Sequence, residues 1–268
     1  MSNSLKIFGA VFNNVEGIKA KDENNVEYVY KIDNALAGLL DNTLTEFDYN
    51  GSGYIPPFFA QNKTALTSIN APNVTVIGAH SFQGCVNVTS CNFNSLTTIE
   101  TGNGGYTLES LGKGHMSVLN LPNLQTCSAS YGMGNMGTSS VPLTLVCPKL
   151  SSISSDFWRG STFDALDLGG DFSSLPVRAL YQGSGCKKLI LRKSDGVVAL
   201  SATSSVGVGS NGGLTNSSIV FVPQALISTY ESNTNWAAAQ ESSGHNFVFS
   251  PIEGSQYENA YADGTPIT

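Results

Sequence analysis

An apolar phrase recurs through the middle of the chain. It reads apolar, any residue, apolar, Pro, polar, apolar, and its strongest copies lie at residues 69–74, 119–124 and 145–150. Alternating apolar positions turn one face of a strand toward a core, and Pro ends the strand because it has no backbone N–H to donate to the sheet. The phrase therefore predicts a series of short strands, each of which leaves its sheet at a proline.

Weaker copies of the phrase begin near Val88, Phe163, Leu189 and Ile219. The intervals between copies are about 20 to 30 residues, which is the range of leucine-rich repeats. One such coil cannot bury its apolar side, whereas stacked coils share a continuous core. The pattern predicts a mainly β leucine-rich-repeat solenoid of about seven irregular coils. A β-sandwich with coincidentally spaced strands is the alternative, because the intervals are uneven.

One unit carries more detail than this pattern. Residues 77–85 read Ile-Gly-Ala-His-Ser-Phe-Gln-Gly-Cys, and residues 88–90 read Val-Thr-Ser. This unit resembles the leucine-rich repeats of BspA-like bacterial surface antigens, and residues 156–160 and 179–183 look like further corners with the order aromatic, any residue, Gly. The resemblance implies a repeat solenoid, placed at residues 61–218, and a role in adhesion.

The two ends of the chain are expected to cap the stack. Within residues 1–60, alternating segments around a polar turn at 22–25 predict a β-hairpin. Residues 219–249 predict a capping unit with a strand, a short helix near 223–231 and the closing Trp236, which would cover the open edge of the last coil. Residues 250–268 are expected to form an extended tail, whose order the sequence leaves open.

The N-terminal segment carries a second resemblance. Residues 12–19, Phe-Asn-Asn-Val-Glu-Gly-Ile-Lys, are similar to openings that precede repeat regions in structural proteins of tailed phages and prophages. The resemblance implies a virion protein attached to the particle by this end. The first residues also lack the basic and apolar stretches of an export signal, which favours a virion over secretion.

Composition disfavours several classes of partner. Only 12 % of residues are charged and the net charge is −7, so the clustered Lys and Arg of a nucleic-acid surface are not expected. No stretch approaches the ~20 apolar residues of a membrane-spanning helix, so membrane insertion is not expected.

The residues that could carry catalysis or bind metal are few. The five cysteines form no C-x-x-C pair and lie at no metal-ligand spacing with the three histidines, so no metal, no cofactor and buried reduced thiols are expected. His80 precedes Cys85 by five residues, but an exposed His80 and an inward Cys85 would not form a dyad. Two of Asp164, Asp167 and Asp171 could cut polysaccharide as a carboxylate pair, but Asp167 is expected to face outward on a solvated face. The interpretation retained is a protein without enzymatic activity.

Three Gly-rich stretches, at 102–106, 130–137 and 206–213, are interpreted as insertions, which in solenoids form loops on the binding face. Permissive linkers are the alternative. The candidate binding residues are Tyr106, Tyr131, Met133, Asn135 and Asn211.

These features together favour a structural protein of a phage virion, associated with the tail or fibre, that recognises a host through a rigid repeat surface. Its expected partners are other virion proteins or copies of itself in a homo-oligomer, and a host-surface protein or polysaccharide. The alternatives are a bacterial adhesin at the cell surface or secreted, and a polysaccharide-degrading tail fibre.

Overall fold

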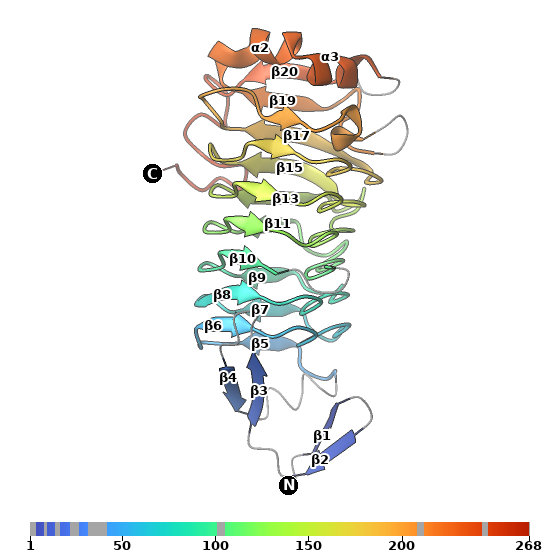
Figure 1. Cartoon of the computed structure of the whole chain (residues 1–268), viewed down its shortest axis with the longest axis vertical. Helices are drawn as coiled ribbons and strands as arrows, with labels where there is room; N and C mark the ends of the chain where they lie inside the picture. The colour runs from blue at the N-terminus through green and yellow to red at the C-terminus, as the bar shows by residue number, and fades with distance from the viewer. Residues whose placement is uncertain are drawn as a thin grey trace.

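The chain forms a solenoid whose coils stack along one long axis (Figure 1). The structure, a computed structural model, describes residues 42–100, 105–207, 212–242 and 246–267, together with the backbone of four strands that precede them. Parallel sheets run along the stack for about seven turns, which confirms the mainly β solenoid predicted from the sequence. Each coil has three sides.

The first side holds two parallel sheets, in the orders β5-β7-β9 and β11-β13-β15-β17-β19-β20. Successive coils pair in register, as when Leu119 of one strand lies beside Leu145 of the next. The prolines that were predicted to end strands do so, since Pro72 and Pro148 each follow a strand closely. The strands of this side are β5 (Glu46–Asp48), β7 (Ser68–Asn70), β9 (Ser90–Asn92), β11 (Val118–Asn120), β13 (Leu143–Cys147), β15 (Thr162–Leu168), β17 (Gly185–Leu191), β19 (Ile219–Val222) and β20 (Val248–Pro251).

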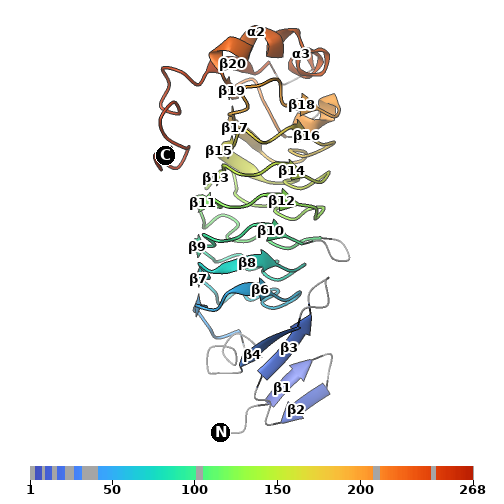
Figure 2. The same cartoon turned by 60° about the vertical axis from the view of Figure 1, so that its left-hand side comes forward.

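The second side holds shorter strands, in the order β14-β12-β10-β8-β6 and in the pair β16-β18. Figure 2 shows them to the right of the first side, stacked along the same axis. These strands are β6 (Gly53–Ile55), β8 (Val74–Ile77), β10 (Thr98–Ile99), β12 (Thr126–Cys127), β14 (Ser152–Ile153), β16 (Ser174–Leu175) and β18 (Ala199–Leu200).

The third side is built from turns that bond from coil to coil. Ala60 N donates to Ser81 O at 2.7 Å, and Leu108 N donates to Gly132 O at 2.7 Å. Such bonds pair the backbone N–H and C=O groups of neighbouring coils much as a sheet does, although these residues are not in strands. The turn segments of this third side are residues 57–62, 79–84, 105–110, 130–135, 155–160 and 177–182.

The core runs unbroken through the stack. On the third side, equivalent positions of four successive coils direct Phe82, Leu108, Met133 and Trp158 into the core, each essentially without solvent exposure. They meet apolar side chains from the first and second sides in a single cluster. Because each coil buries its apolar positions against its neighbours, the repeat and not any single coil is the stable unit.

The cysteines lie in the described part of the chain and none is in a disulfide, as expected. Four of them are buried, and burial raises the pKa of the Cys85 thiol to about 11 and that of Cys186 to about 12. Since the thiolate is the reactive form, the buried thiols should not react with DTNB at pH 8 until the protein is unfolded in guanidinium. Rapid modification of more than one thiol in native buffer would contradict this burial.

The C-terminal end of the stack is capped as predicted by a strand and helices. After β19 come the 3-10 helix Gln224–Leu226, α2 (Ile227–Ser232) and α3 (Thr234–Glu241), and then β20. Trp236 closes the last coil, because its Nε1 donates to Val198 O at 2.8 Å. The helix α3 and the strand β20 go beyond what the sequence predicted. Among the described residues, no helix combines the length and apolar character needed to cross a membrane.

The N-terminal region contains the predicted hairpin and one more. β3 (Gly17–Lys21) pairs antiparallel with β4 (Glu27–Lys31), which confirms the hairpin, and β1 (Ser4–Ile7) pairs with β2 (Ala10–Asn13). The solenoid starts earlier than the predicted boundary at residue 61. β5 and β6 already pair with β7 and β8, so residues 46–55 belong to the first coil and not to a separate cap.

The segment after β20 is packed and not an extended tail. It turns back along the outside of the six-stranded sheet, so that the C-terminus lies beside the middle coils (Figures 1 and 2). Ile252 and Tyr257 join Ala165 and Ile190 in a small apolar cluster on this outer face. Arg192 also donates to the backbone oxygens of Tyr257 and Ala260, at 2.8 and 2.9 Å. We call residues 252–267 the return segment.

Candidate functional site

A column of stacked rings runs along the outside of the third side. Phe58 stacks on His80 with 4.7 Å between ring centres, His80 lies 5.7 Å from Tyr106, and Tyr106 lies 5.1 Å from Tyr131. Three of these residues, Phe58, His80 and Tyr131, have a left-handed backbone with φ of 55° to 59°. Because the same turn recurs in each coil, it points its side chain in the same direction each time. We call these four residues the ring stack.

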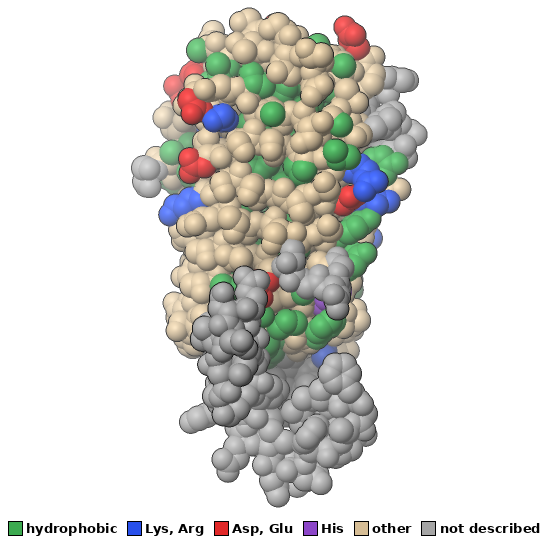
Figure 3. All heavy atoms as spheres, in the orientation of Figure 1, with side chains coloured by type: hydrophobic (Ala, Val, Ile, Leu, Met, Phe, Trp, Pro, Cys, Tyr) green, Lys and Arg blue, Asp and Glu red, His purple; other side chains and the backbone are tan. Residues whose placement is uncertain are grey.

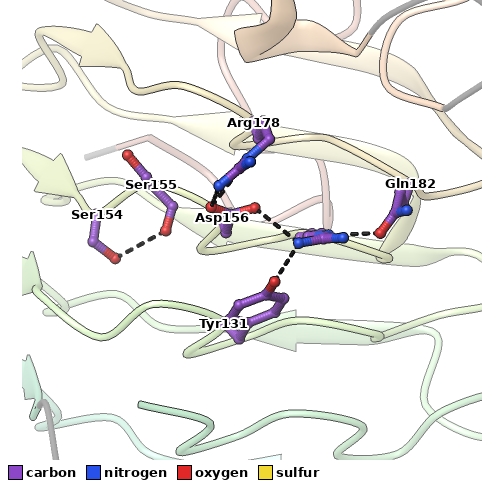
Figure 4. Close-up of polar contacts among 7 residues, drawn as sticks. Tyr131, Ser154, Ser155, Asp156, Arg178 and Gln182 are labelled. Carbon is purple, nitrogen blue, oxygen red and sulfur yellow. Dashed lines mark hydrogen bonds and ion pairs between the residues drawn. The ribbon is translucent and has the colours of Figure 1, made fainter. Parts of the chain in front are cut away.

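Arg159 and Tyr181 continue the line of the ring stack beyond Tyr131. The Arg159 guanidinium lies between the two tyrosine rings. Its carbon atom lies 5.3 Å from the ring centre of Tyr131 and 5.4 Å from that of Tyr181. Its Nε donates to Gln182 Oε1 at 2.6 Å, and its Nη1 donates to the Tyr131 hydroxyl. Figure 4 shows Tyr131, Asp156 and Gln182 directed toward this one guanidinium group. Several partners thus hold Arg159 in one position.

Asp156 supplies the negative charge beside this guanidinium. Its carboxylate is almost fully buried and accepts from Arg178 Nη2 at 2.8 Å and from Arg159 Nη1 at 3.4 Å. The hydrogen bond to Asp156 raises the pKa of Arg178 above its ordinary value. Two guanidinium groups therefore share one buried carboxylate.

A row of amide and carboxylate side chains runs beside the ring stack. Gln61 Nε2 donates to Gln83 Oε1, Gln83 Nε2 donates to Glu109 Oε2, and Asn135 Nδ2 donates to Glu109 Oε1, each at 2.7 Å. Every link joins one coil to the next, so the four side chains are fixed relative to one another. We call Gln61, Gln83, Glu109 and Asn135 the amide row.

Where the ring stack and the amide row meet Arg159, the surface is hollowed. The hollow has a volume of about 560 Å³, which is within the range of small-molecule sites. Gly160 makes room there, because a side-chain carbon at this position would lie 2.2 Å from Asn135 Oδ1. Four successive coils line the hollow with Tyr106, Glu109, Tyr131, Asn135, Arg159, Gly160, Gln182 and Gly183.

The structure brings together three of the five candidate binding residues. Tyr106, Tyr131 and Asn135 all line the hollow. The prediction for Met133 is wrong: its side chain is the inward one of its turn and lies in the core. Asn211 lies outside the described residues.

The Gly-rich stretch at 130–137 is not an insertion. Residues 130–135 form the third side of a regular coil, since Leu108 N and Ser110 N donate to Gly132 O and Gly134 O. The tyrosines therefore belong to the scaffold itself and not to a flexible loop. Parts of the other two stretches, residues 102–104 and 208–211, lie outside the described residues.

The sequence missed Glu109, Arg159 and Gln182. The corner predicted at 179–183 was also misaligned by one residue, because Leu180 takes the inward position and Tyr181 faces outward beside Arg159. A signal for these residues exists in the shared spacing of the turns. Aligning Phe82-Gln83-Gly84 with Trp158-Arg159-Gly160 places Gln83 and Arg159 at the same outward position.

The side chains of His80 and Cys85 contact different partners. His80 was expected at an exposed corner, but it is buried between Phe58 and Tyr106, with its Nδ1 2.8 Å from Gln83 Oε1. Cys85 points inward as predicted, with its Sγ 3.0 Å from Ala60 O. The two side chains therefore have separate environments.

Two of the three candidate carboxylates of this region, Asp164 and Asp167, are held in ion pairs. Asp164 bonds Lys187 and Lys188 at 3.1 and 3.2 Å, and these bonds lower the pKa of its carboxyl against the opposing effect of desolvation. Asp167 does leave the sheet on its outer face, but it is fully buried beneath the return segment and paired with Arg192. The expectation that Asp167 faces solvent is wrong.

Within the part of the chain that the structure describes, no three His, Cys, Asp or Glu side chains come together as a set able to hold a metal ion. Comparison of this protein with models of protein families, with curated proteins and with solved structures found no match.

Proposed function

We propose that this chain is a recognition protein of a phage virion, which binds the surface of a host cell through the third side of its solenoid. The observation that carries this proposal is the hollow, because four coils contribute to it and hydrogen bonds hold its lining in place. A site whose side chains are already ordered loses little conformational entropy on binding.

The repeat architecture supports recognition in a second way. A solenoid carries its side chains on one rigid body, and symmetric copies of such a body on a particle multiply weak contacts into avidity gains of about 10² to 10⁴. The partners proposed are therefore other virion proteins or copies of the same chain on one side, and a host-surface protein or polysaccharide on the other.

The two ends of the stack favour attachment at the N-terminal end. Helices α2 and α3 cover the last coil, and the return segment runs back along the first side. The hairpins β1-β2 and β3-β4 precede the first coil and contain residues similar to phage structural proteins. Attachment there would leave the third side open to a host.

The proposal is tested by mass spectrometry of purified phage particles from the source culture, together with binding of the purified protein to host cells. Peptides of this chain at stoichiometric copy number, and saturable binding to cells, are the expected results. Absence from particles with presence on cell envelopes would overturn the virion role and leave the bacterial adhesin. Presence in particles without binding to cells would overturn host recognition.

A further inference from the structure

We infer that the hollow binds neutral sugar residues of a cell-surface polysaccharide. This inference rests on the proposed function and names the ligand class of the same site. It follows from the hydrogen-bonding groups of the lining, from their charge balance and from the direction in which the lining repeats.

The lining offers donors and acceptors close together. Among the described residues, Arg159 Nη2, Gln182 Nε2 and the Tyr106 hydroxyl have no hydrogen-bond partner, although their neighbours are engaged. Asn135 Oδ1 is an acceptor in the same hollow that the described residues also leave unpaired. A sugar hydroxyl both donates and accepts, so adjacent hydroxyls match such a mixed set better than a purely apolar ligand does.

The charge of the hollow favours a neutral ligand over an anionic one. Arg159 and Arg178 are balanced by Glu109 and Asp156, so these four residues sum to no net charge. Arg159 Nε is already bonded to Gln182, and Nη1 is bonded to both Tyr131 and Asp156. The two-pronged grip on a carboxylate that guanidinium groups offer is therefore not available. The chain as a whole carries −7, and Figure 3 shows few cations on the face in view.

The lining groups repeat along the axis of the stack, which favours a polymer over a single sugar as the ligand. Tyr106 and Tyr131 stack on each other, and Arg159 covers the next face of Tyr131, so the flat faces of Tyr131 are occupied. The edges of the rings and the polar ends of these side chains face solvent, and each coil presents one such group. A linear glycan lying along the stack would therefore meet similar groups at successive coils, as ligands of solenoid surfaces do.

The test uses the full-length protein and cells to which it binds. Oxidation of the cells with periodate, which cleaves the vicinal diols of sugars, should abolish binding, whereas protease treatment should leave it intact. In solution, the neutral fraction of polysaccharide extracted from these cells and separated by anion exchange should bind, and the anionic fraction should bind at least tenfold more weakly.

Two matched variants place the ligand in the hollow. Gln182→Ala removes a lining amide, so affinity for the neutral fraction should fall by about 5- to 10-fold, as expected for one lost hydrogen bond. Gln256→Ala removes the same kind of side chain from the return segment, where its Nε2 donates to the Tyr257 hydroxyl at 2.7 Å, outside the hollow and the amide row, and should leave affinity unchanged. Equal melting temperatures would show that both variants are folded.

Some outcomes overturn the inference while the proposed function stands. Binding to cells that survives periodate but not protease would make the ligand a protein. Tighter binding of the anionic fraction would refute the argument from charge, and an equal loss in Gln256→Ala and Gln182→Ala would refute the location. Failure to bind untreated cells would instead refute the proposed function itself.

Discussion

Arg192→Ala should lower the free energy of unfolding by about 3–5 kcal/mol, because it leaves the carboxylate of Asp167 buried without its counter-charge. Asp167 is fully buried and accepts from Arg192 Nε at 2.7 Å and from Nη2 at 2.8 Å. The same guanidinium also holds the return segment, so the substitution removes those contacts as well. Urea denaturation followed by circular dichroism would measure the loss.

The loss in this variant should depend on pH. Burial raises the pKa of Asp167 above its ordinary value even with Arg192 present, and without Arg192 the pKa should rise further. Between the unfolded pKa of about 3.9 and the raised folded value, the folded state takes up a proton that the unfolded state does not. Stability is therefore gained as pH falls through this window. The deficit of the variant should be smaller at pH 5 than at pH 7.

A matched substitution separates burial from the loss of a cation. Lys187→Ala also breaks an ion pair of this face, with Asp164, but the Lys187 side chain is 59 % exposed. Solvent screens such a pair, so stability should be nearly unchanged. If Lys187→Ala cost as much as Arg192→Ala, or if the deficit of Arg192→Ala did not shrink at pH 5, the role of the buried carboxylate would be refuted.

Trp158→Ala should cost about 3–5 kcal/mol of unfolding free energy, through a cavity in the middle of the stack. Trp158 has no solvent exposure and packs edge-on against Phe157 and Phe163, with ring centres 5.4 and 6.3 Å away. The chain has two tryptophans, so in this variant the fluorescence of Trp236 reports the C-terminal cap alone. Urea titrations read by fluorescence and by circular dichroism would give the loss.

Trp158→Phe is the control for this prediction. Trp158 Nε1 is buried without a hydrogen-bond partner among the described residues, and phenylalanine removes that unsatisfied donor while it keeps most of the ring volume. The phenylalanine variant should therefore lose less than half of what the alanine variant loses. Equal losses in the two variants would indicate that the indole nitrogen, and not the filled volume, matters here.

The strands were predictable because their signals are local. Pro72, Pro122 and Pro148 each mark the end of a strand through a missing N–H, a rule that needs no knowledge of the neighbouring coil. The apolar positions before them alternate in the sequence as they do in space. The approximate number of coils and the fold class followed from counting these repeated phrases.

The third side could not be predicted in the same way. Several of its left-handed positions are taken by residues such as Phe58, Tyr131 and Arg178, which have no preference for that geometry and so give no signal. The turns hold because each bonds to the next coil, and the register between coils decides which side chains meet. Tyr106, Tyr131 and Asn135 were found through their Gly-rich surroundings, whereas Arg159 required the alignment of coils.

Asp167 shows a different limit. Alternation along β15 correctly placed it on the outer face of the sheet, but its burial depends on Ala262, whose backbone N–H reaches it at 2.9 Å from 95 residues further along the chain. No local pattern reports such a partner. The order of residues 252–267 was left open by the sequence for the same reason.

The return segment also affects the order in which contacts can form while the chain is being synthesised. Each coil contacts its neighbours, so the first coils can form while later ones are still on the ribosome. Asp263, however, accepts from the side chain of Asn120, 143 positions earlier, at 2.7 Å. This contact forms only after residue 263 has left the ribosome, so a nascent chain whose coils are already stacked still carries Asp167 and Arg192 uncovered by the return segment.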